Sequence, residues 1–174
     1  MKITITGMPG SGKSTVGKIL AEKLKMSFMS IGEMRRAVAK IRGMTIFEYN
    51  KLNEDTDTPV DKYQEDFGKQ NDNIIVEGRT SFHFIPDSVK VFLGADINVA
   101  AERIFKDPRN TEKKYNNVEE VEAAIKDRME NDGKRYKERY GFDAFDRKNF
   151  DIVIDTTSIS AEEVAEEIIL KLQK

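Results

Sequence analysis

Residues 7–14 read Gly7-Met8-Pro9-Gly10-Ser11-Gly12-Lys13-Ser14. They match the phosphate-binding loop pattern, in which glycine stands at the first and sixth positions and is followed by lysine and then serine or threonine. Glycines let successive backbone N–H groups turn toward one anion, because no Cβ stands in the way. In such loops the lysine reaches the β- and γ-phosphates and the hydroxyl supplies a ligand to Mg²⁺. The stretch therefore predicts a nucleoside triphosphate site, with Lys13 on the phosphates and Ser14 on Mg²⁺.

The residues on either side of this loop predict a strand before it and a helix after it. Residues 2–6 form a short, β-branched run that ends at a glycine, as a buried strand should. Residues 13–25 place Val16, Leu20 and Leu24 at helical spacing. Strand, loop and helix thus follow in the order that phosphate binding needs, since the helix directs its positive end at the anion.

The rest of the chain alternates between short apolar runs and amphipathic segments. Further strands are expected at 27–30, 74–77, 89–93 and 151–155, and helices after Ser30, within 45–70, at about 97–105 and 118–139, and after Ser160. Several strands are apolar throughout, which is typical of a parallel sheet with both faces covered. We therefore expect one α/β domain over residues 1–174, a P-loop NTPase fold with about five parallel strands and helices on both faces. In the helix after Ser30, Met34, Val38 and Ile41 should form the buried side.

The composition excludes several classes of function. A formal net charge of −2 argues against non-specific nucleic-acid binding, and the apolar runs are strand-sized, which argues against a membrane span. The chain has no cysteine and one histidine, so thiolate and histidine-rich metal sites are excluded. We expect a cytoplasmic protein, since the first strand leaves no room for a signal peptide. We also expect a monomer whose partners are small-molecule nucleotides.

Residues that suit phosphate chemistry stand at the ends of predicted strands. These are Gly7, Ser30, Glu77 and Gly94. Ligands of such sheets bind beyond the carboxyl ends of the strands, so the four positions should converge on one cleft. Glu77 follows an apolar strand, where an unpartnered carboxylate is costly, and we predict that it places Mg²⁺ together with Ser14. An ordinary solvated acid at a strand end is the alternative.

Arginines are expected around both phosphates. Arg79 lies two residues beyond Glu77, where its guanidinium suits a phosphate bound through two hydrogen bonds. The helix after residue 30 offers Arg35, Arg36 and Arg42, and spacing alone does not choose between them.

The predicted helix 118–139 carries Arg128, Arg135 and Arg139 on one stripe, beside an apolar stripe that should face the core. Arginines in that position can reach inward to phosphates. A salt-bridged surface, with Asp132 close by, is the alternative.

Taken together, these features resemble the nucleoside monophosphate kinases, and most closely the short cytidylate kinases of the archaeal type. The resemblance covers nearly the whole chain. Its anchors are Gly7–Thr15, Ser30-Ile31-Gly32-Glu33 with Arg36, Arg42-Gly43-Met44, Glu77-Gly78-Arg79, Lys134-Arg135-Tyr136-Lys137 and Tyr140-Gly141.

The resemblance implies roles for these residues. The first anchor would bind ATP. Outside the anchors, Arg103 flanks the polar segment 106–116 and is a further candidate on the ATP side. The arginines corresponding to Arg36 and Arg79 would hold the monophosphate, and those at positions like Arg128 and Arg135 would stabilise the transferring phosphoryl group. Monophosphate-binding candidates next to these arginines are Ser30, Gly32 and Gly78.

The resemblance also implies a division of the domain. Residues 31–72 would form a mobile monophosphate-binding arm and 104–116 a small lid. The core would consist of residues 1–30, 73–103 and 117–174.

The sequence departs from the family pattern around the acceptor. Thr80 stands where bacterial cytidylate kinases have an acidic residue, and Arg35 occupies a position that is usually apolar or aromatic. On the arm, Asp61 and Gln64 are candidates for reading the edge of the base.

We therefore expect an ATP- and Mg²⁺-dependent kinase that phosphorylates CMP or dCMP by direct in-line transfer. The alternatives are the same chemistry on AMP or UMP, and a non-catalytic protein that binds ATP as a signal or assembly ligand.

Overall fold

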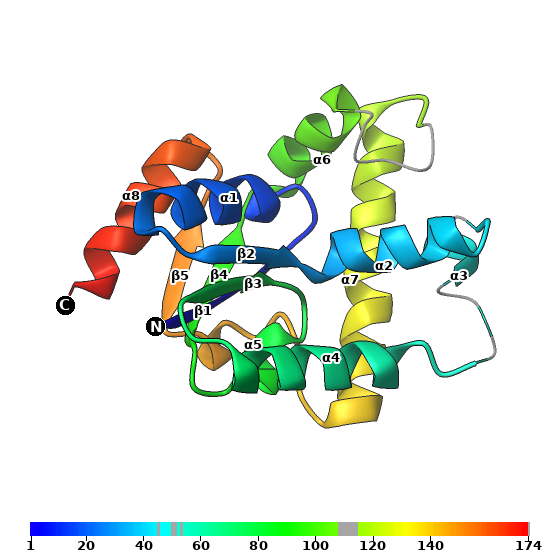
Figure 1. Cartoon of the computed structure of the whole chain (residues 1–174). Helices are drawn as coiled ribbons and strands as arrows, with labels where there is room; N and C mark the ends of the chain where they lie inside the picture. The colour runs from blue at the N-terminus through cyan, green and yellow to red at the C-terminus, as the bar shows by residue number, and fades with distance from the viewer. Residues whose placement is uncertain (45, 50–51, 53, 108–114, 174) are drawn as a thin grey trace.

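Five parallel strands form one sheet in the part of the chain that the structure describes (Figure 1). The structure is a computed structural model, and it describes residues 1–174 except 45, 50–51, 53, 108–114 and 174. In space the strands follow the order β2-β3-β1-β4-β5, so the first strand of the chain lies in the middle. Their bounds are β1 (Lys2–Gly7), β2 (Ser27–Ser30), β3 (Ile74–Glu77), β4 (Val89–Gly94) and β5 (Ile152–Asp155).

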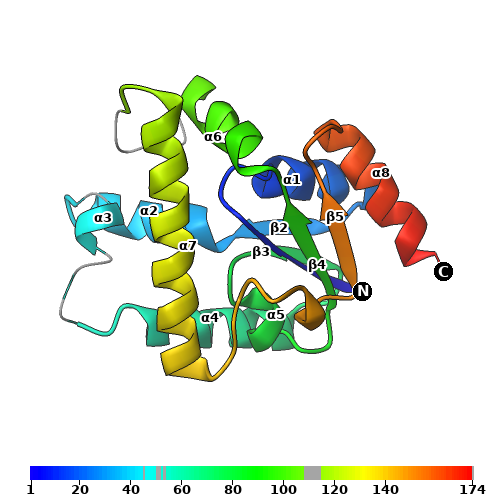
Figure 2. The ribbon, with the colours of Figure 1, turned by 180° about the vertical axis from the view of Figure 1, so that it is seen from behind.

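Helices cover both faces of this sheet, as Figures 1 and 2 show. Helices α1 (Lys13–Leu24) and α8 (Ala161–Leu172) lie on one face, and α4 (Asp57–Gln70) and α5 (Ser81–Phe84) lie on the other. Beyond the carboxyl ends of the strands stand α2 (Ile31–Ile41), α3 (Ile46–Tyr49), α6 (Ile97–Lys106) and α7 (Val118–Tyr140). A short 3₁₀ turn, η2 (Arg147–Asn149), precedes β5. The predicted α/β architecture is confirmed.

Two apolar clusters, one on each face of the sheet, form much of the core. Ile3 and Ile5 of β1 pack with Leu20 of α1 and Ile168 of α8 on one face, and all four are fully buried. On the other face, Ile74 and Val76 of β3 join Ile31 and Ile85 in a second cluster. Alternate residues of β3 thus face different helices, since Ile75 belongs to the first cluster, and this gives the continuous apolar run seen at 74–76.

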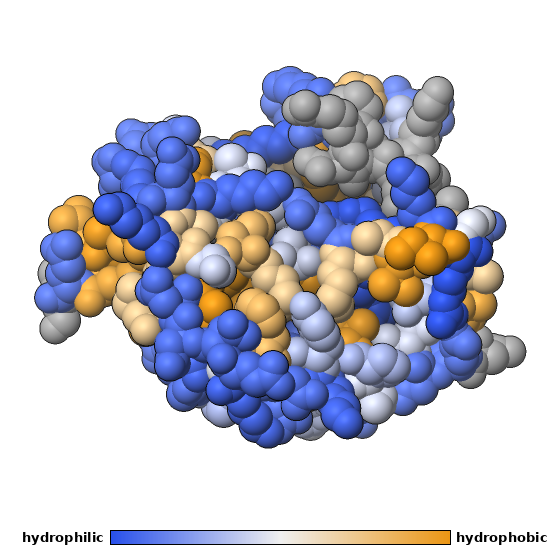
Figure 3. All heavy atoms as spheres, in the orientation of Figure 1, coloured by the Kyte–Doolittle hydropathy of each residue, from blue (hydrophilic) through white to orange (hydrophobic). Residues whose placement is uncertain are grey.

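Helix α2 corrects one expectation about the core. Its N-terminus is buried at Ile31, but the side chain of Ile41 is 86% exposed. The helix runs outward past the end of the sheet (Figure 1), so its last turn lies clear of the strands that bury its first. The space-filling view in Figure 3 shows apolar residues at the surface of the face that Figure 1 presents. Within the described ranges, none of the helices is both long and apolar enough to cross a membrane.

Candidate active site

The loop over residues 7–14 joins β1 to α1 at the carboxyl end of the central strand. Gly10 has φ +78°, and a Cβ there would lie 2.5 Å from the carbonyl oxygen of Ala100, so only glycine fits. Gly12 has φ +80° and is the N-cap of α1, which no side chain caps. A Cβ at Gly12 would meet no atom within 4 Å, so space is open at the helix N-terminus. The loop therefore has the form of an anion cradle.

The ammonium of Lys13 lies among several charged groups at this loop. Its Nζ donates a hydrogen bond to the carbonyl oxygen of Met8, at 2.6 Å. Burial lowers the pKa of Lys13 to about 8, and the positive charges of Arg79 and Arg128 act in the same direction, while Glu77 opposes them. The fold thus brings together four charged residues that lie up to 115 positions apart in the sequence, since 128 − 13 = 115.

Glu77 joins the loop to the start of α2. It is the last residue of β3, its residue exposure is 8%, and its Oε2 accepts hydrogen bonds from the hydroxyls of Ser14, at 3.2 Å, and Ser30. Ser30 is the N-cap of α2, where its Oγ accepts from the backbone N–H of Glu33. The carboxylate is therefore buried and hydrogen-bonded, so Glu77 is not an ordinary solvated acid at a strand end.

The Ser14 and Glu77 oxygens suit Mg²⁺. Hydroxyl and carboxylate oxygens are the donors that this hard cation prefers, and it is usually held by one or two protein groups together with substrate phosphates. Among the described residues, no group of three or more His, Cys, Asp or Glu could hold a metal by itself. The donor set fits a magnesium ion that arrives with a nucleotide.

Two arginines, one on α2 and one on α7, have no partner in the part of the protein that the structure describes. Among the residues that the structure describes, neither Arg36 nor Arg128 forms a hydrogen bond or an ion pair. The guanidinium of Arg36 lies beside the first turn of α2, where a Cβ at Gly32 would come within 3.4 Å of its Nη1. The nearby charge of Arg79, followed by burial and a contribution from Arg36, lowers the pKa of Arg128 to about 10. Asp132, which pairs with Arg79, offsets only part of this repulsion, and positive groups held this close suit a polyanion.

Known proteins share this combination of loop and fold. Residues 3–127 match a family model described as "AAA domain". The cytidylate kinase of Methanobrevibacter smithii is 31% identical over 176 residues, covering 99% of both chains. That of Archaeoglobus fulgidus is 37% identical over 175 residues, covering 98% of this chain and 93% of the other. This chain belongs to the cytidylate kinase family. It is thereby one of the nucleoside monophosphate kinases.

Solved structures place this cytidylate kinase family member in the fold of P-loop kinases. A shikimate kinase from Acinetobacter baumannii superposes with a TM-score of 0.68 at 19% identity, over 99% of this chain and 92% of the other. An uncharacterized protein from Eubacterium ventriosum superposes with a TM-score of 0.73 at 18% identity, over 100% of this chain and 99% of the other. At such identities the likeness concerns the fold alone.

Other predicted site residues lie next to this centre rather than in it. Arg103 donates to Thr156 Oγ1, at 3.1 Å, and to the backbone carbonyls of Thr156 and Thr157, at 2.7 and 3.2 Å. Since Thr156 Oγ1 lies 3.3 Å from the carbonyl oxygen of Ser11, Arg103 borders the phosphate-binding loop. Its contact with ATP stays a prediction. Residues 108–114 of the predicted lid lie outside the described residues.

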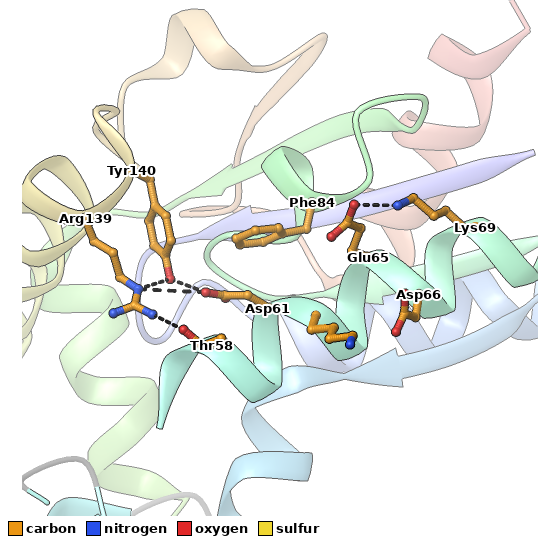
Figure 4. A pocket seen from close by; sticks show the side chains of 9 residues that line it. Thr58, Asp61, Glu65, Asp66, Lys69, Phe84, Arg139 and Tyr140 are labelled. Carbon is orange, nitrogen blue, oxygen red and sulfur yellow. Dashed lines mark hydrogen bonds and ion pairs between the residues drawn. The ribbon is translucent and has the colours of Figure 1, made fainter. Parts of the chain in front are cut away.

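Arg135 and the arm residue Asp61 are engaged with other side chains. Arg135 pairs with Asp57 and Asp132. The carboxylate of Asp61 accepts a hydrogen bond from the hydroxyl of Tyr140, as Figure 4 shows. The hollow in that view lies between α4, α5 and the end of α7, and its lining includes no residue of the loop 7–14. The roles predicted for Arg135 and Asp61 stay predictions.

The idea that Gln64 reads a base edge is not met. Gln64 is fully buried, and its amide is already hydrogen-bonded within the protein. The amide oxygen accepts from Ser81 Oγ, at 2.6 Å, and the amide nitrogen donates to Thr80 Oγ1, at 3.4 Å. Asp57, whose carboxylate pairs with Arg35 and Arg135, was not singled out from the sequence. Its only sequence signal is an acidic residue in the first turn of a helix, which is usually read as favourable for the helix dipole.

Proposed function

We propose that this protein transfers the γ-phosphoryl group of ATP to CMP or dCMP, giving ADP and the nucleoside diphosphate. The single observation that carries the proposal is that Arg36 and Arg128 have no partner among the described residues. Arg128 lies close enough to Arg36, Arg79 and Lys13 to interact with their charges. A protein that only senses ATP would need the phosphate-binding loop and no further arginines. The additional arginines on the other side of the cleft suit a second phosphate.

In the proposed complex, one group of residues binds ATP and a second group binds the acceptor nucleotide. Residues 7–15 bind ATP with Arg103 at their border. Arg36 and Arg79 orient the acceptor phosphate, with Ser30, Gly32 and Gly78 beside them and Asp61 on the arm. An oxygen of the acceptor phosphate forms a bond to the γ-phosphorus while the bond from that phosphorus to the β–γ bridging oxygen breaks, and ADP leaves.

Catalysis in this scheme is positioning and charge neutralisation. Lys13 neutralises the β- and γ-phosphates, and Arg128 and Arg135 stabilise the charge of the transferring group. When bound, Mg²⁺ would neutralise the charge that develops on the phosphates. Ser14 and Glu77 would hold it. No strong general base is needed, because the acceptor phosphate is already a nucleophile.

The choice of cytosine rests on the relatives named above and on the anchors shared with them. AMP and UMP remain the alternatives, since the departures at Arg35 and Thr80 lie on the acceptor side. Residues 31–72 as a moving arm, 104–116 as a lid, a monomeric state and a cytoplasmic location stay predictions.

A coupled assay of ADP release tests the proposal. With Mg·ATP and a panel of CMP, dCMP, UMP, dTMP, AMP and GMP, we expect turnover to depend on acceptor and to be fastest with CMP or dCMP. Preference for AMP would keep the chemistry and change the acceptor. Tight ATP binding without turnover of any acceptor would contradict the proposal and favour an ATP-binding accessory protein.

Replacing Glu77 by glutamine should weaken the use of Mg²⁺. The amide keeps an oxygen for the serine hydroxyls but loses the charge that attracts the cation, so we expect the Mg²⁺ concentration for half-maximal rate to rise about tenfold. A titration of Mg²⁺ at fixed ATP measures this, and chelation with EDTA should abolish turnover in both proteins. The matched control is Glu166→Gln, an exposed carboxylate paired with Lys23. Equal Mg²⁺ dependence in Glu77→Gln and wild type would contradict the assignment.

A further inference from the structure

A row of alternating charges connects the arm segment (residues 31–72) with α7 and the loop after β3. Arg35 Nη1 lies 2.7 Å from Asp57 Oδ1, and Asp57 Oδ2 lies 2.9 Å from Arg135 Nη1. Arg135 Nη2 lies 3.3 Å from Asp132 Oδ1, and Asp132 Oδ2 lies 2.7 Å from Arg79 Nε. We call these five residues the charge ladder. It runs without a break from α2 and α4 to an arginine at the end of β3.

The two carboxylates of the charge ladder are well shielded from solvent. The side chains of Asp57 and Asp132 are 14% and 13% exposed, whereas that of Glu54, which pairs with Arg42 within the arm segment, is 52% exposed. Exposed pairs contribute little, but removing one member of a shielded pair leaves an uncompensated charge and is costly. Each ladder carboxylate pairs with two guanidinium groups, so its loss would remove one ion pair from each of them.

A second set of contacts also joins the arm segment to α7, but it does not include the arginines near the phosphate-binding loop. Arg139 pairs with Asp55 and donates to Thr58, and Tyr140 donates to Asp61 (Figure 4). These contacts hold the start of α4 against the last turn of α7. None of them involves Arg36, Arg79, Arg128 or Arg135. The charge ladder is thus the set of described ion pairs that links the arm segment to arginines of the phosphate cluster.

From this we propose that Asp57 is a positioning residue for the acceptor phosphate, which it aligns through Arg135, Asp132 and Arg79. The inference rests on the proposed function, since it assigns phosphate-binding roles to Arg79 and Arg135. Asp57 lies in the first turn of α4, so any shift of the arm segment moves one end of the ladder. The orientation of the two arginines is therefore coupled to the position of the arm segment.

The variant Asp57→Asn tests this, because it keeps the shape of the side chain and removes its charge. We expect the KM for CMP to rise about tenfold, while the KM for ATP stays within about twofold, since the ion pairs of Asp57 are with Arg35 and Arg135 and not with residues 7–14. The matched control is Glu54→Gln, which removes the same charge from an ion pair inside the arm segment. It should leave both KM values unchanged. A loss of stability alone would lower the active fraction and would not separate the two substrates.

A second measurement does not depend on turnover. Hydrogen exchange of the ligand-free protein should show faster exchange of α2 and α4 amides in Asp57→Asn than in Glu54→Gln, because the arm segment has lost its tie to α7. If Asp57→Asn does not fold, Arg35→Met removes the outer rung of the ladder and should raise the KM for CMP about threefold.

The outcomes separate the inference from the proposed function. A wild-type protein that turns over no nucleoside monophosphate would overturn both. Normal wild-type turnover, with KM values in Asp57→Asn and Arg35→Met that match those in Glu54→Gln, would overturn the role of Asp57 alone. Equal rises in the KM values for ATP and CMP would overturn it too, because they would indicate general damage.

Discussion

Lys13→Ala should lower kcat by about a thousandfold with CMP as acceptor, because the lost ammonium is the charge closest to the β- and γ-phosphates in the proposed complex. In the structure its Nζ lies over the loop, held by the carbonyl oxygen of Met8, within reach of the electrostatic influence of Glu77, Arg79 and Arg128. No neighbouring cation can replace it, since Arg79 and Arg128 approach from other elements of the fold.

Stopped or coupled assays at saturating ATP and CMP measure this effect, and ATP binding is followed separately by calorimetry. Binding should weaken much less than turnover falls, because the backbone N–H groups of the loop remain. Lys18→Ala is the matched control: it removes a lysine from the same helix, where the side chain is 59% exposed and pairs with Glu33. Near-normal turnover of Lys13→Ala would show that the loop does not carry the chemistry.

The phosphate-binding half of the site could be predicted from the sequence because its parts are local. The loop, the strand before it and the helix after it lie within the first 25 residues, and glycine spacing reports directly on the backbone. Glu77 could be predicted because a parallel sheet brings strand ends together, as the register of Ser30 beside Glu77 confirms.

The acceptor half could be predicted only in part, because its contacts join distant segments. Asp57 and Arg135 are 78 positions apart, and nothing in either local pattern specifies their pairing. Gln64 illustrates the opposite error. A polar residue on an amphipathic helix was expected to face a ligand, but Thr80 and Ser81 satisfy its amide in the core. Periodicity identifies which face of a helix is polar and leaves open what that face meets.

The stripe of arginines on α7 shows the same limit within one helix. Spacing placed Arg128, Arg135 and Arg139 together, and the structure divides them by partner. Arg139 pairs with exposed Asp55, and Arg135 pairs with shielded Asp57 and Asp132. Arg128 has no partner among the described residues. The surface alternative therefore suits Arg139, and Arg128 is the member of the stripe that no described side chain already engages.

Arg128→Met should lower kcat by about a hundredfold to a thousandfold and change the KM for CMP by less than about threefold. An interaction made mainly with the transferring group is lost from the transition state and hardly affects the ground state. The matched control on the same helix is Lys126→Met, whose lysine is 61% exposed and pairs with Glu122. It should leave both constants unchanged.

Stability distinguishes this role from a structural one. The proximity of Arg79 is the first cause of the lowered pKa of Arg128, so removing Arg128 relieves repulsion in the ligand-free protein. The thermal unfolding midpoint of Arg128→Met should therefore not fall below that of the wild type, even as turnover is lost. A lower midpoint with proportionate loss of activity would make Arg128 a structural residue. An intact kcat with a raised KM for CMP would instead move it to the acceptor phosphate, beside Arg36 and Arg79.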